Sequence, residues 1–134
     1  MSALYPSFAA SMWASTNSDL TSATVKAVLV SSAYNSAHVY RSSLTGVAQS
    51  GGSDAVLTVT GLSATNGVLS TSNDTSTFSS VTAGGPYTAV VLFVDSGSPG
   101  TSPLIAYLDG FSSLTSSGND VIVDWNASGI VTLT

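Results

Sequence analysis

The stretch YTAVVLFVDSGSPGTSPLIAYLDG, residues 87–110, decides the fold of this chain. It contains two runs of apolar, β-branched and aromatic residues, 87–95 and 103–110, on either side of a loop rich in glycine, serine and proline. Short runs of this kind between turn residues are typical of β-strands. If the two strands formed a hairpin, Asp95 and Asp109 could approach each other, although capping of turns is the simpler role for both aspartates.

The same pattern recurs through most of the chain. Short runs of apolar and hydroxyl-bearing residues, each bounded by Gly, Asn, Asp, Ser or Pro, occupy 24–30, 55–60, 67–72, 77–81, 120–126 and 129–134. Such spacing predicts an all-β fold, mainly an antiparallel β-sandwich of the immunoglobulin-like or jelly-roll-like kind. We expect the last two runs to form a terminal hairpin, with Gly129 free to adopt a positive φ.

The N-terminal residues have a different periodicity. In residues 4–15, apolar side chains recur with helical spacing and Pro6 stands where a first helical turn accepts proline, so a short N-terminal helix is predicted. Residues 36–44 could form a second short helix or an irregular excursion. We expect one domain over residues 1–134, with the helix and a turn in 1–20 and the sandwich in 21–134.

The composition limits the classes of function. Charged residues make up only 7% of the 134 residues, while 27 serines and 16 threonines supply the polarity. Seven aspartates against two basic residues give a net charge of −5, which disfavours nucleic-acid binding. The absence of cysteine excludes disulfides and Cys-ligated metals. With no apolar stretch of membrane-spanning length and no signal-peptide pattern, we expect a soluble protein made in the cytoplasm, without a membrane partner or a cofactor.

All the basic side chains lie in one window, KAVLVSSAYNSAHVYRS, residues 26–42. We expect Lys26 to protect its strand from edge-to-edge pairing with another chain. His38 and Arg41 could pair with aspartates of the same domain or of a neighbouring copy, which makes them candidate subunit contacts. On the predicted N-terminal helix, aromatic side chains could contact another molecule. The candidate subunit or capsid contacts are therefore Tyr5, Phe8, Trp13, Lys26, His38 and Arg41.

Enzymatic readings have little support in the sequence. Serine, histidine and aspartate are all present, but no G-x-S-x-G motif occurs, so hydrolysis through His38 is the weakest hypothesis. Asp120 and Asp124, four residues apart on a strand, would be about 13 Å apart, which is too far for a catalytic carboxylate pair. A calcium site remains open, although no EF-hand spacing is found. We expect no catalytic or metal-ligating residues.

The chain resembles a family of small structural proteins encoded by tailed bacteriophages. The resemblance covers both ends of the chain and mainly leaves out residues 45–80. Segments that carry it are LYPSFAASMW, SDLTSATVKAVLVSSAY with SAH, VVLFVDSGSPGTSPLIAYLDGF and DVIVDWNASGIVTLT. In the first helix, several positions that are usually charged in the family are Ser or Ala here.

This resemblance implies a non-enzymatic virion protein made in the host cytoplasm. A capsid decoration or cement protein that stabilises the head shell is the leading expectation, with the major capsid protein or another virion protein as partner. Attachment to a symmetric lattice favours a closed homo-oligomer, most naturally a trimer. The alternative is a receptor- or glycan-binding module of a tail tip or head fibre, with contacts in loop 95–103 and in the loop after Val30.

Overall fold

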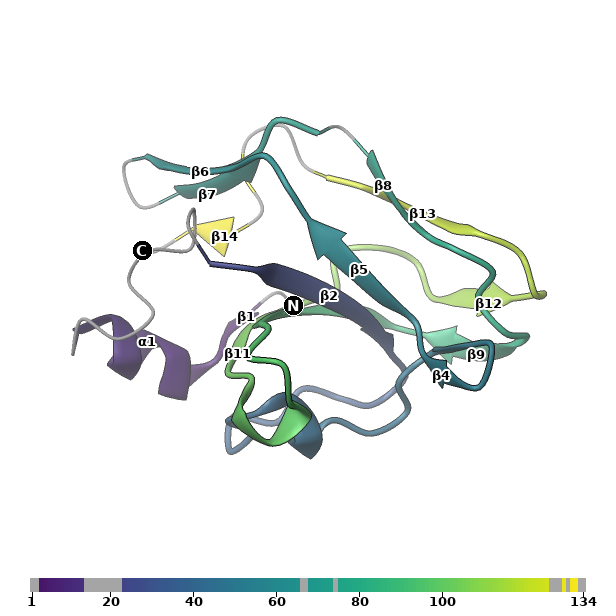
Figure 1. Cartoon of the computed structure of the whole chain (residues 1–134), viewed down its shortest axis with the longest axis horizontal. Helices are drawn as coiled ribbons and strands as arrows, with labels where there is room; N and C mark the ends of the chain where they lie inside the picture. Colours follow the sequence, from purple (N-terminus) through teal and green to yellow (C-terminus); the bar gives the residue numbers. More distant parts are fainter. Residues whose placement is uncertain are drawn as a thin grey trace.

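A five-stranded antiparallel sheet forms the centre of the protein (Figure 1). The computed structural model describes residues 3–13, 23–65, 68–73, 75–125, 129 and 131–132. In the central sheet the strand order is β1 (Ala3–Leu4), β11 (Leu104–Leu108), β10 (Ala89–Val94), β2 (Val25–Val30) and β5 (Val56–Val59). Apart from short helical segments, the described chain is built from antiparallel strands, which confirms the predicted all-β fold.

The hairpin at 87–110 forms as its apolar runs suggest, but it separates the two aspartates. Strands β10 and β11 pair antiparallel, with Val90 opposite Leu108 and Phe93 opposite Leu104. Their connection contains a short 3-10 helix, η2 (Pro99–Thr101). Asp95 therefore follows the end of β10 beside the connection, whereas Asp109 follows the far end of β11. The alternative that these two carboxylates approach each other across the hairpin is therefore not the arrangement observed.

Smaller sheets complete the fold around the central one. Two of them are two-stranded ribbons, each with one strand that lines a recess together with Leu29 and Val90 of the central sheet. The smaller sheets are β13 (Val121–Asp124) with β8 (Thr75–Phe78), β12 (Leu114–Ser116) with β9 (Gly84–Tyr87), β14 (Val131–Thr132) with β7 (Val68–Thr71) and β6 (Leu62–Thr65), and β3 (Gln49–Ser50) with β4 (Ser53–Asp54).

The predicted terminal hairpin does not form. Strand β13 pairs with β8 and strand β14 pairs with β7, so the last two strands belong to different sheets. Gly129 between them does have a positive φ, of 132°. Alternation of side chains predicts that a segment is a β-strand but not which strand it pairs with. The partners of β13 and β14 therefore could not be predicted from their own sequences.

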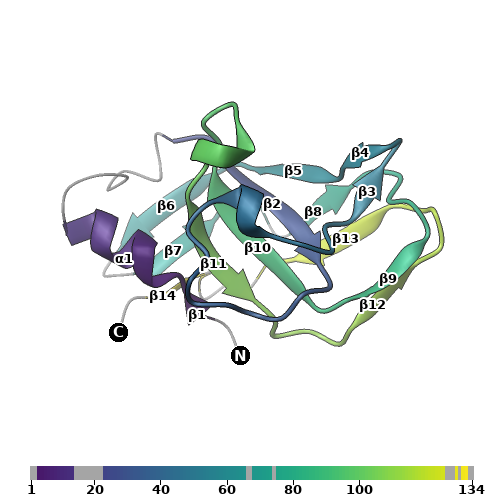
Figure 2. The ribbon, with the colours of Figure 1, turned by 90° about the horizontal axis from the view of Figure 1, so that it is seen from below.

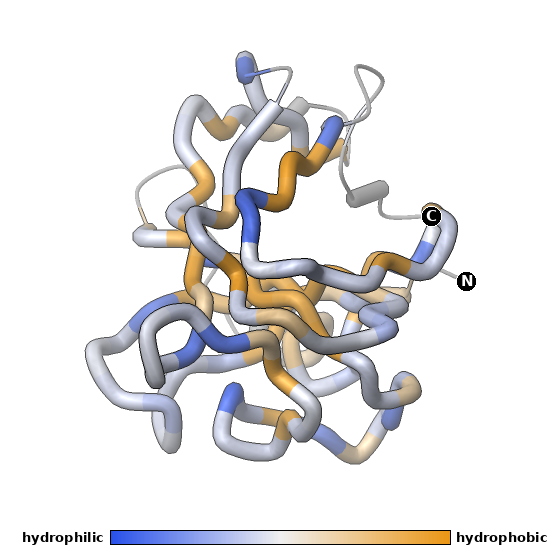
Figure 3. The backbone as a smooth tube through the Cα atoms, turned by 90° about the vertical axis from the view of Figure 1, so that its right-hand side faces the viewer, coloured by the Kyte–Doolittle hydropathy of each residue, from blue (hydrophilic) through white to orange (hydrophobic). Residues whose placement is uncertain are grey.

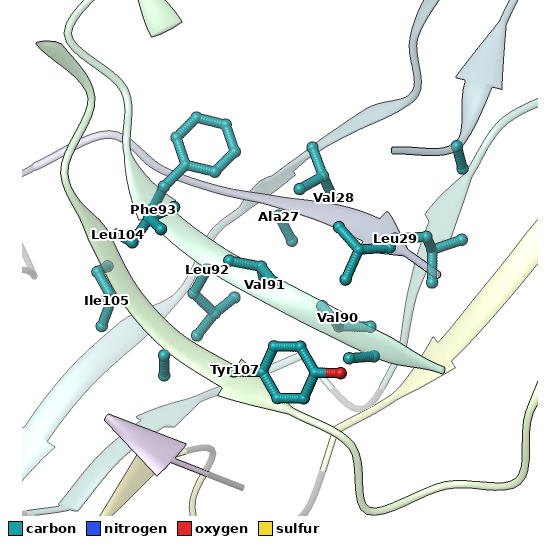
Figure 4. Packing of buried hydrophobic residues seen from close by; sticks show 14 of the residues in the cluster. Ala27, Val28, Leu29, Val90, Val91, Leu92, Phe93, Leu104, Ile105 and Tyr107 are labelled. Carbon is teal, nitrogen blue, oxygen red and sulfur yellow. The ribbon is translucent and has the colours of Figure 1, made fainter. Parts of the chain in front are cut away.

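Apolar segments gather at the centre of the molecule (Figure 3), and buried side chains lie on both faces of the central sheet (Figure 4). Every residue of β2 except Lys26 is buried, and all of β10 except Val94 is buried. Side chains alternate between the two faces of a strand, and residues in register share a face. Leu29 and Val90 are in register on one face, and the two ribbons cover them. Lys26 and Phe93 are in register on the opposite face.

Helix α1 (Pro6–Trp13) confirms the predicted N-terminal helix and begins at Pro6. Tyr5, the residue before the helix, attaches it to the central sheet, because its backbone N–H donates to the carbonyl of Ile105 at 2.9 Å. The Tyr5 ring lies 5.3 Å from that of Tyr34, which in turn lies 5.6 Å from that of Tyr107. Burial raises the pKa of Tyr5 well above its ordinary value.

The segment between β2 and β3 crosses the sheet face that carries Lys26 (Figure 2). The helix considered for residues 36–44 is reduced to one 3-10 turn, η1 (Arg41–Ser43). Where the predicted helix would begin, the chain instead forms a turn, in which the side-chain oxygen of Asn35 accepts a hydrogen bond from the backbone N–H of Ala37 at 2.9 Å. Asparagine at such a position competes with helix formation, so the irregular alternative is the one observed.

Candidate interaction surface

The basic residues of the window 26–42 are brought together around Phe93. Arg41 forms an ion pair with Asp54 and its Cζ lies 5.2 Å from the centroid of the Phe93 ring. Lys26, the cross-strand neighbour of Phe93, has its ammonium 2.7 Å from a carboxylate oxygen of Asp95. We call Lys26, Arg41, Asp54, Asp95 and Phe93 the ion-pair cluster. It joins the segment after β2 and the β10–β11 connection to the central sheet.

The electrostatics of the cluster favour the charged state of Asp95. The hydrogen bond from Lys26 is the main cause that lowers the pKa of Asp95, followed by the bond that the backbone N–H of Gly97 donates. This second bond makes Asp95 the cap of a turn, as aspartates at such positions commonly are. The carboxylate of Asp54 also accepts the side-chain amide of Gln49. Each cation of the cluster is therefore paired with an aspartate, although the Nε atom of Arg41 is buried without a hydrogen-bond partner in the described part of the chain.

The placement of Lys26 corrects the role predicted from the sequence. Strand β2 lies between β10 and β5, so it is not an edge strand and Lys26 cannot protect an exposed edge. Both Lys26 and Arg41 have aspartate partners in the same chain. From the sequence, Arg41 could pair with an aspartate of its own domain or of a neighbouring copy. In the structure it pairs with Asp54 of its own domain.

Two of the predicted contact residues lie in the core. Tyr5 and Phe8 are 0% and 2% exposed, so neither side chain offers a surface to another molecule in this fold. The helical spacing correctly predicts α1, but the helix packs on β11 of the same chain. Trp13 is the last residue of α1, and its side chain lies outside the described residues.

His38 does not have the surroundings of a catalytic base. Its Nδ1 atom is buried and has no hydrogen-bond partner in the described part of the chain. In a catalytic triad, a carboxylate orients the histidine through this nitrogen. In the described part of the chain, no carboxylate orients His38 in this way.

A groove with an apolar floor lies on the opposite face of the central sheet. Leu29 and Val90 belong to its lining, and its volume is about 260 Å³. Phe111 and Ile122, which also line it, are 41% and 65% exposed. We call this recess the apolar groove; its lining residues are Leu29, Val90, Phe111, Ser112, Leu114, Val121, Ile122, Val123 and Asp124.

Sequence reasoning missed the apolar groove for a physical reason. Phe111 is one aromatic among eleven, most of which were expected in the core. Ile122 alternates with Asp120 and Asp124 on one strand face, so those aspartates mark the face as outward, but an isoleucine between two valines does not by itself indicate exposure. The structure shows the difference: Val121 is 8% exposed, and Ile122 is the most exposed large apolar side chain described.

A second exposed surface forms where two loops meet. The backbone N–H of Arg41 donates to Ser102 at 2.9 Å, and that of Leu104 donates to Val39 at 2.9 Å. Beside these contacts the Tyr40 side chain is 42% exposed. Loop 95–103 adds hydroxyl groups, including those of Ser96 and Thr101, which are 2.6 Å apart.

Within the described ranges, no three His, Asp or other ligand-type side chains cluster closely enough to hold a metal ion. Among the helices that the structure describes, none has both the length and the apolarity needed to cross a membrane. No protein-family model, curated protein or solved structure matches the chain.

Proposed function

We propose that the chain is a non-enzymatic structural protein of a tailed-bacteriophage virion, most simply a decoration or cement protein of the head shell. The observation that carries this proposal is the pair of exposed side chains, Phe111 and Ile122, at the apolar groove. Exposed apolar side chains that frame a recess are a common feature of surfaces that bind other proteins. The partner would be the major capsid protein or another virion protein.

The resemblance to phage structural proteins and the internal pairing of charges also support this proposal. Lys26 and Arg41 are engaged within the chain, and the rest of the surface is rich in hydroxyl groups. Stability that depends on buried apolar area and hydrogen bonds varies little with ionic strength, which suits a component of a particle outside the cell. A closed trimer on a three-fold position of the shell is the proposed assembly.

The test uses particles produced with and without the gene for this chain. Particles that lack the protein should lose infectivity or release DNA at a lower temperature or under milder osmotic shock, and added purified protein should restore resistance. Electron microscopy of both particles would locate the missing density on the shell. Equal stability of the two particles, or density on the tail alone, would refute the decoration role.

A receptor- or glycan-binding module is the second candidate, and the surface around Tyr40 favours it. An exposed aromatic ring beside a hydroxyl-rich loop is suited to stacking and hydrogen bonding with a sugar. A glycan array with the full chain should then give binding that Tyr40→Ala abolishes, whereas Val56→Ala, at another exposed apolar side chain, leaves binding intact. An array without any bound glycan would remove this candidate.

A further inference from the structure

The apolar groove lies between two ribbons that do not join into one sheet. Strand β13 bonds to β8, and β12 bonds to β9. One edge of β13 (residues 121–124) faces β8. The opposite edge makes no backbone hydrogen bond with any described residue. These four residues line the groove together with Leu114 of β12. An edge strand beside an apolar recess can pair with an extended peptide, whose alternate side chains then enter the recess.

The charges around the groove are of one sign. Asp124 lines it, and Asp120 precedes β13; neither has an ion-pair partner in the described part of the chain. Lys26 and Arg41, the only lysine and arginine in the sequence, lie on the opposite face of the central sheet, where aspartates neutralise them. The groove therefore combines an apolar floor with an acidic rim.

We propose that the apolar groove binds an extended segment of a partner protein, which adds alongside β13, places an apolar side chain against the exposed Phe111 and Ile122, and brings a lysine or arginine to Asp124. Only the statement that this partner is a virion protein rests on the proposed function. The acidic rim selects a basic segment, because opposite charges on two surfaces promote association and like charges oppose it.

Other occupants fit the groove less well. A second copy docking through the same face would bring Asp124 against acidic residues of its partner, in a chain whose net charge is −5. The volume of about 260 Å³ is just below the roughly 300–1,000 Å³ typical of sites for drug-sized ligands. It suits one or two apolar side chains rather than a cofactor.

The probe is the peptide acetyl-Lys-Val-Leu-Val-Lys-amide, titrated into the ¹⁵N-labelled full chain and followed by NMR. The expected result is a set of saturable shifts in the backbone amides of residues 111–114 and 121–124. An aspartate-flanked peptide and a peptide with serine in place of the apolar residues should leave these amides unchanged. Binding of the aspartate-flanked peptide with equal affinity, or shifts confined to other regions, would overturn the proposal.

Two variants and one modified peptide test the geometry. Ile122 is 65% exposed, so Ile122→Ser should fold normally and weaken binding by about tenfold, whereas Val56→Ser, at an exposed apolar site outside the groove, should not. Asp124→Asn should weaken binding of the lysine-flanked peptide by about two- to fivefold without affecting a serine-flanked one. N-methylation of the central leucine should abolish binding; retained affinity would overturn the addition of a strand at β13.

Binding of the same variants to particles separates this inference from the proposed function. If wild-type protein restores the stability of deficient particles and Ile122→Ser does so equally well, the groove inference fails while the decoration role stands. If the peptide binds the groove but wild-type protein has no effect on the particles, the decoration role fails and the groove inference stands.

Discussion

The guanidinium of Arg41 lies over the ring of Phe93, with its Cζ 5.2 Å from the ring centroid. Phe93 belongs to the central sheet and Arg41 to the segment that crosses it, so this contact attaches an irregular connection to the most regular part of the fold. Arg41 is only 13% exposed, which gives the contact more weight than a surface ion pair has.

Arg41→Ala should lower the free energy of unfolding by about 1–3 kcal/mol, because it removes the stacking on Phe93, the buried stem of the side chain and the ion pair with Asp54. Arg41→Lys should lose less, since it keeps the charge but not the planar group. Urea unfolding followed by tryptophan fluorescence measures both. Unchanged stability of Arg41→Ala would show that the connection does not need this attachment.

The stability should depend on pH through Asp95. The hydrogen bond from Lys26 lowers the pKa of this carboxyl below its ordinary value of 3.8, so the unfolded chain binds more protons than the folded one at low pH. The resulting stabilisation is complete above the ordinary pKa and is lost as the pH falls through the lowered value.

We therefore expect Asp95→Asn to be less stable than wild type near neutral pH, with a difference that shrinks between about pH 5 and pH 2. Lys26→Gln should behave in the same way, because it removes the cation that causes the shift. Urea unfolding at a series of pH values measures this. A difference that stays constant down to about pH 2 would contradict the assignment.

Ser116 tests a buried hydrogen bond. Its hydroxyl donates to the carbonyl of Val81 at 2.8 Å, and the side chain is almost fully buried. Ser116→Ala leaves that carbonyl unsatisfied and should cost about 1–3 kcal/mol in the free energy of unfolding. Ser117→Ala, at the exposed neighbouring position, is the control and should cost less than about 0.5 kcal/mol. Equal effects of the two substitutions would show that burial of the bond is not what matters.

Gly85 tests the close approach of β9 to β12. Its φ is +116°, and a Cβ atom there would lie 2.8 Å from the carbonyl oxygen of Leu114. Gly97 has a similar φ of +92° with nothing within 4 Å, so Gly97→Ala measures the conformational strain alone. We expect about 1–2 kcal/mol for Gly97→Ala and roughly 3 kcal/mol or more for Gly85→Ala, measured by thermal unfolding. A loss at Gly85 no larger than that at Gly97 would contradict the steric explanation.

The central sheet was largely predictable because its strands are strongly apolar. The runs at 24–30, 87–95 and 103–110 became β2, β10 and β11 within a few residues. Strands β9 and β12 were missed, since GGPY and LTS carry glycine, proline or hydroxyl residues that read as turns. Both are strands because they pair with each other, which is a tertiary effect.

The site was less predictable than the fold. The sequence shows that the basic residues are concentrated in one window. It does not show their aspartate partners, because these are distant in sequence: Asp95 lies 69 positions after Lys26. The sequence predicts Tyr5 and Phe8 as contacts because a short amphipathic helix has one apolar face, and it does not say whether that face meets its own sheet or another molecule.

The division of the outer layer into separate two-stranded ribbons gives the molecule two levels of local stability. Amide protons of β2 and β10, which are bonded on both sides within the central sheet, should exchange with solvent only through global unfolding. Those of β12 and β13, whose strands are each bonded on one side only, should exchange earlier. The edge that an incoming strand would meet therefore lies in the less protected part of the fold.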